Sequence, residues 1–224
     1  MGDLERNSPL YLYRRGVCAF VILTLRGTAM AQSANTLAIK PRASHIFERE
    51  EHEHYVEPLW CSQRLFDVEK FHGDIFDPAC GFGRIPESAM LAGYCCAASD
   101  IVDRGYKIAL KNDFFTDASL ADNIVSNPPF DCFREFALHA LELIRYKLAL
   151  IWLVRTLPAA RWLADTPLRR IYLLTPRPSM PPGHTITAGS KPSGGTQDFC
   201  WLIWERGYVG APEVKWLHRD GAAA

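Results

Sequence analysis

Short apolar runs alternate with longer amphipathic segments from residue 55 onwards. Runs of strand length lie at 73–77, 94–99, 121–126, 147–154, 170–175 and 199–205. The most apolar of them is KLALIWLV at 147–154, and such a continuous run is typical of a strand covered on both faces. The pattern therefore predicts a sheet whose central strand lies near residue 150.

Helical spacing separates several of these runs. Apolar residues recur at three- and four-residue intervals in 133–146, and helices are also expected at 86–92 and 157–164 and from Glu57-Pro58 onwards. Proline suits a first helical turn, as at Pro58 and Pro86, and Gly93 ends the second helix. Residues 106–110 fit either a third strand or a short helix. Alternating strands and helices predict an α/β fold with a doubly wound, mostly parallel sheet.

The chain divides into a 1–54 N-terminal extension, partly irregular, and a domain at 55–224. An apolar run at 16–25 follows Arg14-Arg15 and precedes Ala29-Met30-Ala31, which outlines a secretory signal. However, Arg26 follows the run directly, and the run is too short for a membrane span. We expect an extension or a loose segment rather than a working signal, with Met30 as an alternative start.

Residues 176–198 are rich in Pro, Gly, Ser and Thr and are expected to form a long loop between the last two strands. Two interpretations remain open. The loop could lie beside a substrate cleft and grip nucleic acid with the cationic residues in and before it, or it could be a plain surface loop. Those cationic residues are Arg169, Arg170, Arg177, His184 and Lys191.

Charge and cysteine usage narrow the class of protein. The 25 Lys and Arg residues balance 25 Asp and Glu residues, so binding to nucleic acid would need a local basic surface. Seven cysteines, an odd number without a Cys-x-x-Cys pair, favour reduced thiols over a disulfide framework or a zinc ribbon. His52 and His54 match no common zinc spacing. We expect a cytoplasmic protein without a metal or a membrane anchor, and the pattern specifies no oligomeric state.

A glycine turn with acidic residues near it is the first candidate for chemistry. DPACGFGR at 77–84 follows the first strand, at the edge of the sheet where α/β proteins bind ligands. Pro86 rules out the dinucleotide fingerprint, and no Gly-Lys-Ser/Thr follows for a phosphate loop. Asp77 can accept from a ligand ammonium, and Asp100, 23 residues later, suits ribose hydroxyls. Asp113 with Phe114 can hold an adenine, although a turn aspartate beside core phenylalanines explains the pair equally well.

The sharpest motif is Asn127-Pro128-Pro129-Phe130, directly after the run at 121–126. Two prolines remove two backbone donors and stiffen the chain. The Asn127 side-chain oxygen and the Pro128 carbonyl can then accept both hydrogens of an amino group, while Phe130 offers a flat face to a planar base. This arrangement points to chemistry on an exocyclic amino group.

These elements, in this order, resemble the class I S-adenosylmethionine-dependent methyltransferases. The tetrapeptide is similar to their (Asp/Asn/Ser)-Pro-Pro-(Tyr/Phe/Trp) signature, and the phrases ADNIVSNPPF and FCWLIWERGY resemble small prophage-type DNA adenine-N6 enzymes. The resemblance implies a Rossmann-like seven-stranded sheet with an antiparallel last strand. It implies S-adenosyl-L-methionine as cofactor, bound by Asp77, Pro78, Ala79, Cys80, Gly81, Gly83, Asp100, Ile101, Asp113 and Phe114. It assigns the target base to Asn127, Pro128, Pro129 and Phe130.

The resemblance implies DNA as the partner, single-stranded or with a flipped base. Because no block of about a hundred residues is available for a target-recognition domain, sequence specificity is expected to be relaxed. Two alternatives remain. The same chemistry could act on an RNA base amino group or a protein glutamine amide, or the chain could be a non-catalytic, cofactor-binding relative.

Overall fold

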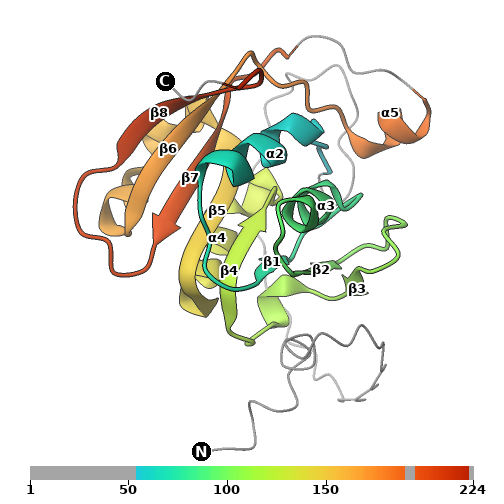
Figure 1. Ribbon diagram of the computed structural model, residues 1–224, viewed down its shortest axis with the longest axis horizontal. Coiled ribbons are helices and arrows are strands. Elements are labelled where there is room, and N and C mark those ends of the chain that lie inside the picture. The colour runs from blue at the N-terminus through green and yellow to red at the C-terminus, as the bar shows by residue number, and fades with distance from the viewer. Residues whose placement is uncertain (1–53, 190–194, 222–224) are drawn as a thin grey trace, which may run out of the picture. The chain divides into compact units, whose positions relative to one another are not determined.

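The computed structural model describes residues 54–189 and 195–221, and its centre is a mixed eight-stranded sheet in the order β3-β2-β1-β4-β5-β7-β6-β8 (Figure 1). The expectations for the N-terminal extension, for Met30 and for Lys191 lie outside the described residues. The strands are β1 Ile75–Asp77, β2 Cys96–Asp100, β3 Leu110–Lys111, β4 Ala121–Ser126, β5 Ile144–Leu153, β6 Leu168–Thr175, β7 Phe199–Glu205 and β8 Glu213–His218.

Most neighbouring strands are parallel, and β7 is the exception. It runs antiparallel to both β5 and β6, whereas β8 lies parallel to β6 at the edge of the sheet. The predicted antiparallel strand at 199–205 is therefore present, but it is not the last strand, and the predicted count of seven is wrong. The pattern missed β8 because this edge strand buries Leu217 while Val214 and Trp216 are exposed.

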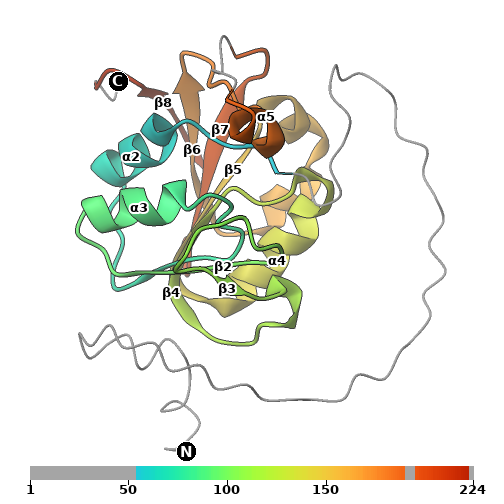
Figure 2. The ribbon, with the colours of Figure 1, turned by 90° about the vertical axis from the view of Figure 1, so that its right-hand side faces the viewer.

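Helices cover both faces of the sheet (Figure 2). The main helices are α2 Leu59–Val68, α3 Arg84–Leu91 and α4 Phe133–Leu143. Residues of α4 pack with Leu148, Leu150 and Trp152 of β5, whereas residues of α2 and α3 pack with its alternate positions, such as Ile151. Because successive side chains of a strand point to opposite faces, both faces of β5 must be apolar. The continuous run at 147–154 is thus explained and its prediction as a central strand is confirmed.

Three local expectations need correction. The segment predicted as a helix at 157–164 forms two 3-10 segments, η4 Val154–Ala159 and η5 Arg161–Asp165, because Pro158 inside it lacks the backbone donor that a helix needs. Residues 106–109 form neither a strand nor a helix, and β3 begins at Leu110. The expected loop at 176–198 contains a short helix, α5 Gly183–Thr187.

Two further 3-10 turns follow strand ends and carry predicted site residues: η2 Phe114–Thr116 and η3 Phe130–Cys132. In the described ranges no helix is long and apolar enough to span a bilayer.

Candidate functional site

A cavity of about 320 Å³ lies beyond the carboxyl ends of β1, β2 and β4. Most of the predicted site residues line it, namely Pro78, Ala79, Asp100, Ile101, Asp113, Phe114, Asn127, Pro128, Pro129 and Phe130. A small adjoining cavity of about 10 Å³ is lined by the predicted residues Asp77, Cys80 and Gly81. The two cavities share His54, Tyr55, Ala79 and Asn127, so they belong to one region. Gly83 lines neither cavity.

The glycine turn between β1 and α3 depends on left-handed backbone conformations. Gly81 has φ of 51° and Gly83 has φ of 82°. Residues with a Cβ atom rarely adopt such positive φ angles, whereas glycine does so readily. A Cβ atom at Gly81 would also collide with the His54 ring, and one at Gly83 with the Tyr106 ring. The glycines therefore permit close packing around the turn.

Asp100 holds this turn in place from the end of β2. Its Oδ2 accepts the backbone N–H of Gly81 at 2.9 Å, and its Oδ1 accepts that of Val102 at 2.9 Å. The guanidinium of Arg104 lies 3.7 Å from the same carboxylate. Asp100 lines the large cavity as well, so one side chain joins the glycine turn to this cavity.

Asp77 is a buried carboxyl group with one unpartnered oxygen. Its Oδ1 accepts from the Ser126 hydroxyl at 2.7 Å and from the Ala79 backbone N–H at 3.2 Å. Its Oδ2 is buried and has no hydrogen-bond partner among the described residues. Burial raises the pKa of Asp77 well above its ordinary value. A cation at Oδ2 would reverse this effect, because it would favour the ionised form.

Asp113 and the two phenylalanines after it differ in their contacts and in their exposure. The Asp113 carboxylate accepts the Phe115 backbone N–H at 3.0 Å and thereby shapes η2. Phe114 is 4% exposed and packs at 4.5 Å, between ring centroids, on Phe136. Phe115 also lines the cavity but is 47% exposed. Phe115 belongs to the Asp113-Phe114-Phe115 motif of the sequence, in which the adenine contact was assigned to Phe114, and its ring also borders the cavity.

The amide of Asn127 is held by two acceptors from the chain before β1. Its Nδ2 donates to the Tyr55 carbonyl at 2.7 Å and to Glu57 Oε2 at 2.8 Å. With both N–H bonds used, the nitrogen faces this segment and Oδ1 is left as the acceptor, since an oxygen could not donate to either partner. Asn127 lines both cavities.

The ring of Tyr55 faces the ring of Phe130. Their centroids lie 6.2 Å apart and their planes differ by 7°. Both residues line the large cavity, so two nearly parallel aromatic rings border it. Sequence analysis missed Tyr55 and Glu57 because they stand 70 or more residues from the Asn127 motif and carry no spacing signal of their own.

Glu57 is buried beneath this site. Burial raises its pKa, while the Asn127 hydrogen bond and the charge of Arg84 act in the opposite direction. Arg84 also donates to the Glu57 backbone carbonyl at 2.6 Å. The site thus contains two buried carboxyl groups, Glu57 and Asp77, whose ionisation is disfavoured by burial.

The segment 54–56 is tied to the segment before α5. Val56 donates its backbone N–H to the Pro181 carbonyl at 3.0 Å, and Gly183 donates to the His54 carbonyl at 2.8 Å. The His54 ring lies against both Gly81 and Gly183, where a Cβ atom would meet it. Part of the 176–198 segment therefore lies beside the candidate site.

The cations predicted to accompany that segment are placed differently. Arg177 forms a two-bond ion pair with Asp198, both side chains being exposed. Arg169 and Arg170 follow Leu168 at the amino-terminal end of β6, and this end of the strand lies opposite the cavity. Their expected contribution to the site is wrong, because β6 runs in the same direction as β5 and its amino end points away from the carboxyl ends that carry the site.

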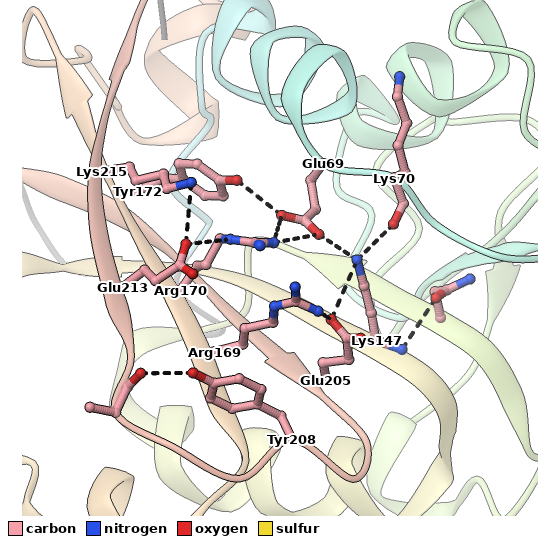
Figure 3. A network of polar contacts seen from close by, with 12 residues as sticks. Glu69, Lys70, Lys147, Arg169, Arg170, Tyr172, Glu205, Tyr208, Glu213 and Lys215 are labelled. Carbon is pink, nitrogen blue, oxygen red and sulfur yellow. Dashed lines mark hydrogen bonds and ion pairs between the residues drawn. The ribbon is translucent and has the colours of Figure 1, made fainter. Parts of the chain in front are cut away.

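Figure 3 shows where these two arginines are engaged instead. Glu69, 2% exposed, accepts from Lys147, from Arg170 at 3.0 Å and from the Tyr172 hydroxyl at 3.0 Å. Arg169 pairs with Glu205 in the same network. A buried carboxylate with several donors is satisfied, so this network joins the end of α2 to β5 and β6 as a structural element.

Comparisons with known proteins establish the fold. No protein-family model matches the chain, and neither does any curated protein. Solved structures do match. The methyltransferase subunit of a type I restriction-modification system from Streptococcus thermophilus has a TM-score of 0.51 and 12% identity over 75% of this chain and 47% of that one. This chain thus spans about half of that subunit.

Two further structures have the same kind of activity in their names. A protein from Pyrococcus horikoshii assigned as an RNA methyltransferase has a TM-score of 0.49 and 16% identity, covering 67% of this chain and 82% of that one. Magnesium protoporphyrin IX methyltransferase from Synechocystis, with bound S-adenosylmethionine, has a TM-score of 0.46 and 14% identity, covering 65% and 75%. A fold alone does not decide a substrate, so the substrate of this chain has to be argued from its site.

Proposed function

We propose that this protein is an S-adenosylmethionine-dependent methyltransferase that methylates the exocyclic amino group of adenine in DNA. The observation that carries the proposal is the Asn127 amide. Both of its N–H bonds are used by Tyr55 and Glu57, so its oxygen is the acceptor left at the cavity that Phe130 and Tyr55 border. An amino group beside a flat ring is the chemistry that this arrangement suits.

The residues around the glycine turn fit the proposed cofactor. The unpartnered Asp77 Oδ2 suits an ammonium group, and Asp100 suits the ribose hydroxyls. Asp113, Ile101 and the Phe115 ring border the space that the adenine would take. When bound, the cofactor would supply a sulfonium methyl group whose carbon an amino nitrogen can attack directly, so that the C–S bond breaks, S-adenosylhomocysteine leaves and the methylated nitrogen loses a proton to water.

The methionine end of the cofactor needs more space than the small cavity offers. Its volume of about 10 Å³ is close to that of a single water position. The His54 ring lies against Gly81 at this place, so we propose that it moves aside when the cofactor enters. The hydrogen bonds of residues 54–56 to Pro181 and Gly183 would then shift with it.

The target base would lie on the Phe130 side of the large cavity. A base inside a duplex hides its amino nitrogen, so the protein must take a flipped base or a single strand. Asn127 Oδ1 would accept one N–H of the amino group, which orients its lone pair and stabilises the positive charge that develops on nitrogen. Phe130 would hold the base by stacking on its ring, and Tyr55 would border the same space.

The experiment that tests this proposal uses the purified full chain with isotopically labelled S-adenosylmethionine. Double- and single-stranded DNA, RNA and a protein with an exposed glutamine are offered separately, and the products are identified by mass spectrometry of nucleosides and peptides. We expect labelled N6-methyladenine in DNA. Label in RNA or in a glutamine amide would instead assign the same chemistry to another substrate, and label in none of them would support a non-catalytic relative.

Asn127→Ala tests the assigned role of this residue in the same assay. It should lower turnover about a hundredfold, as does the loss of one preorganised partner of a developing charge. Cofactor affinity, measured by calorimetry, should stay unchanged because the variant leaves Asp77 and Asp100 in place. Turnover equal to that of the parent would contradict the assigned role of Asn127.

A further inference from the structure

The contact between Glu57 and Asn127 joins two segments that are 70 residues apart. Glu57 stands just before α2, is 6% exposed, and accepts the Asn127 amide N–H at 2.8 Å. The second amide N–H donates to the Tyr55 carbonyl at 2.7 Å. Burying a carboxyl group is unfavourable, yet this one is placed directly behind the residue proposed to hold the target amino group.

We propose that Glu57 is a positioning residue that orients the Asn127 amide and supplies it with negative charge, so that the two side chains together act as one extended carboxylate toward the target amino group. This inference rests on the proposed function and goes beyond it. The (Asp/Asn/Ser)-Pro-Pro signature carries its own charge when its first residue is Asp. Here the first residue is neutral, and the charge stands one hydrogen bond behind it.

The physical argument concerns the amide group. A carboxylate that accepts an amide N–H draws the proton toward itself and shifts electron density to the amide oxygen. The oxygen that is left for the substrate, Asn127 Oδ1, thereby becomes a stronger acceptor. It holds the target N–H more firmly as positive charge develops on nitrogen, and this difference between ground state and transition state raises turnover. Glu57 touches no substrate in this scheme and acts through Asn127.

Several groups around Glu57 influence its charge. The Arg84 guanidinium, from α3, favours the ionised form, whereas burial disfavours it. Asp77 at the end of β1, Cys61 on α2 and His54 also surround this space, and the charge of Glu57 acts on the first two of them. Because the pKa of Glu57 is raised, its carboxylate becomes protonated at a higher pH than an exposed glutamate, and turnover should fall as the pH is lowered through that value.

The test compares Glu57→Gln, Asn127→Asp and the variant that carries both changes. Glu57→Gln can still accept from Asn127 but lacks the charge, so kcat at saturating DNA and cofactor should fall about tenfold, while the cofactor Kd stays unchanged. The decrease in kcat at low pH that protonation of Glu57 causes should also be absent from this variant. Asn127→Asp sets two carboxyl groups against each other, so it should be less active still. In the double variant, the new amide at position 57 can donate to the new carboxylate at position 127. This restores one charge and one hydrogen bond, while the Tyr55 carbonyl loses its donor. We therefore expect part of the activity to return, so that the double variant is more active than Asn127→Asp.

Glu87→Gln is the matched control, because Glu87 is an exposed carboxylate in the first turn of α3. It should leave kcat, its pH profile and the cofactor Kd unchanged. Circular dichroism and thermal melting of each variant show whether it is folded. The rescue by the double variant separates a charge effect from simple loss of structure, since two disruptive changes would add.

A second measurement does not need a substrate. In an ¹H–¹⁵N spectrum, the Asn127 side-chain amide is identified by its absence from Asn127→Ala. We expect one of its protons to lie far downfield at a pH above the pKa of Glu57, to move upfield in Glu57→Gln, and to titrate with Glu57. If the amide shows ordinary shifts that Glu57→Gln leaves alone, the inference is overturned.

These two measurements separate the inference from the proposed function. Labelled product with the parent protein but equal kcat in Glu57→Gln overturns the inference and leaves the function standing. No methylated product from any substrate, together with the expected amide signature, overturns the function and supports the coupling of Glu57 to Asn127.

Discussion

Replacing Asp77 by Asn tests the cofactor site most directly. The two side chains have the same shape, and the contacts that Oδ1 makes with the Ser126 hydroxyl and the Ala79 N–H can be retained. What changes is the second atom, from a buried oxygen without a partner among the described residues to an amide nitrogen. An ammonium group would lose its charged acceptor there.

The expected loss of cofactor affinity follows from the worth of a hydrogen bond to a charged group, about 1.5–3 kcal/mol. This corresponds to an increase in Kd of about 10- to 150-fold. Calorimetric titration of S-adenosylmethionine into the parent and into Asp77→Asn measures it. The affinity of the parent should also rise as the pH is raised through the pKa of Asp77, because binding needs the ionised form of a carboxyl group whose pKa is raised by burial.

The same shift affects folding, with a definite sign. The folded protein holds the Asp77 proton to a higher pH than the unfolded chain does, so its stability falls as the pH rises from the ordinary carboxyl range through the raised pKa. Asp77→Asn lacks this dependence, and its stability relative to the parent should increase with pH in denaturant titrations. An equal cofactor Kd in the two proteins, together with parallel pH profiles of stability, would refute the assignment of Asp77.

Four further outcomes are expected. Asp100→Ala should raise the cofactor Kd at least about tenfold by calorimetry, since it removes the ribose acceptor and the anchor of Gly81. Phe130→Ala should weaken binding of a target-containing oligonucleotide by about 1–3 kcal/mol in a fluorescence titration. Arg177→Ala removes the partner of Asp198 in an exposed ion pair and should leave the salt slope of DNA binding unchanged, whereas a slope lowered by about one would assign a phosphate contact to the 176–198 segment. Lys147→Met should lower the unfolding free energy by about 3 kcal/mol in denaturant titrations, because it breaks a buried ion pair, and it should leave cofactor affinity unchanged.

Local pattern was sufficient for most of the sheet. The run at 147–154 indicated a strand covered on both sides, the glycine turn with Gly81 and Gly83 lies between β1 and α3, and the tetrapeptide beginning at Asn127 directly follows β4. Site residues of this kind can be recognised in the sequence because they are neighbours along the chain. The pattern was insufficient where burial is weak, as in β8, whose Val214 and Trp216 are exposed, or where a helix is interrupted, as at Pro158.

Contacts between distant segments were decided by the tertiary structure alone. The sequence places Glu57 in a helix start and says nothing of its carboxylate being 2.8 Å from the Asn127 amide. It also leaves open whether Arg170 faces a ligand or Glu69. Only the direction of β6 shows that this arginine lies at the end of the sheet away from the cavity. Motifs reveal which groups a site contains, because those groups are neighbours along the chain. The partners that orient and charge these groups come from any segment that packing brings near, and packing depends on the whole sequence at once.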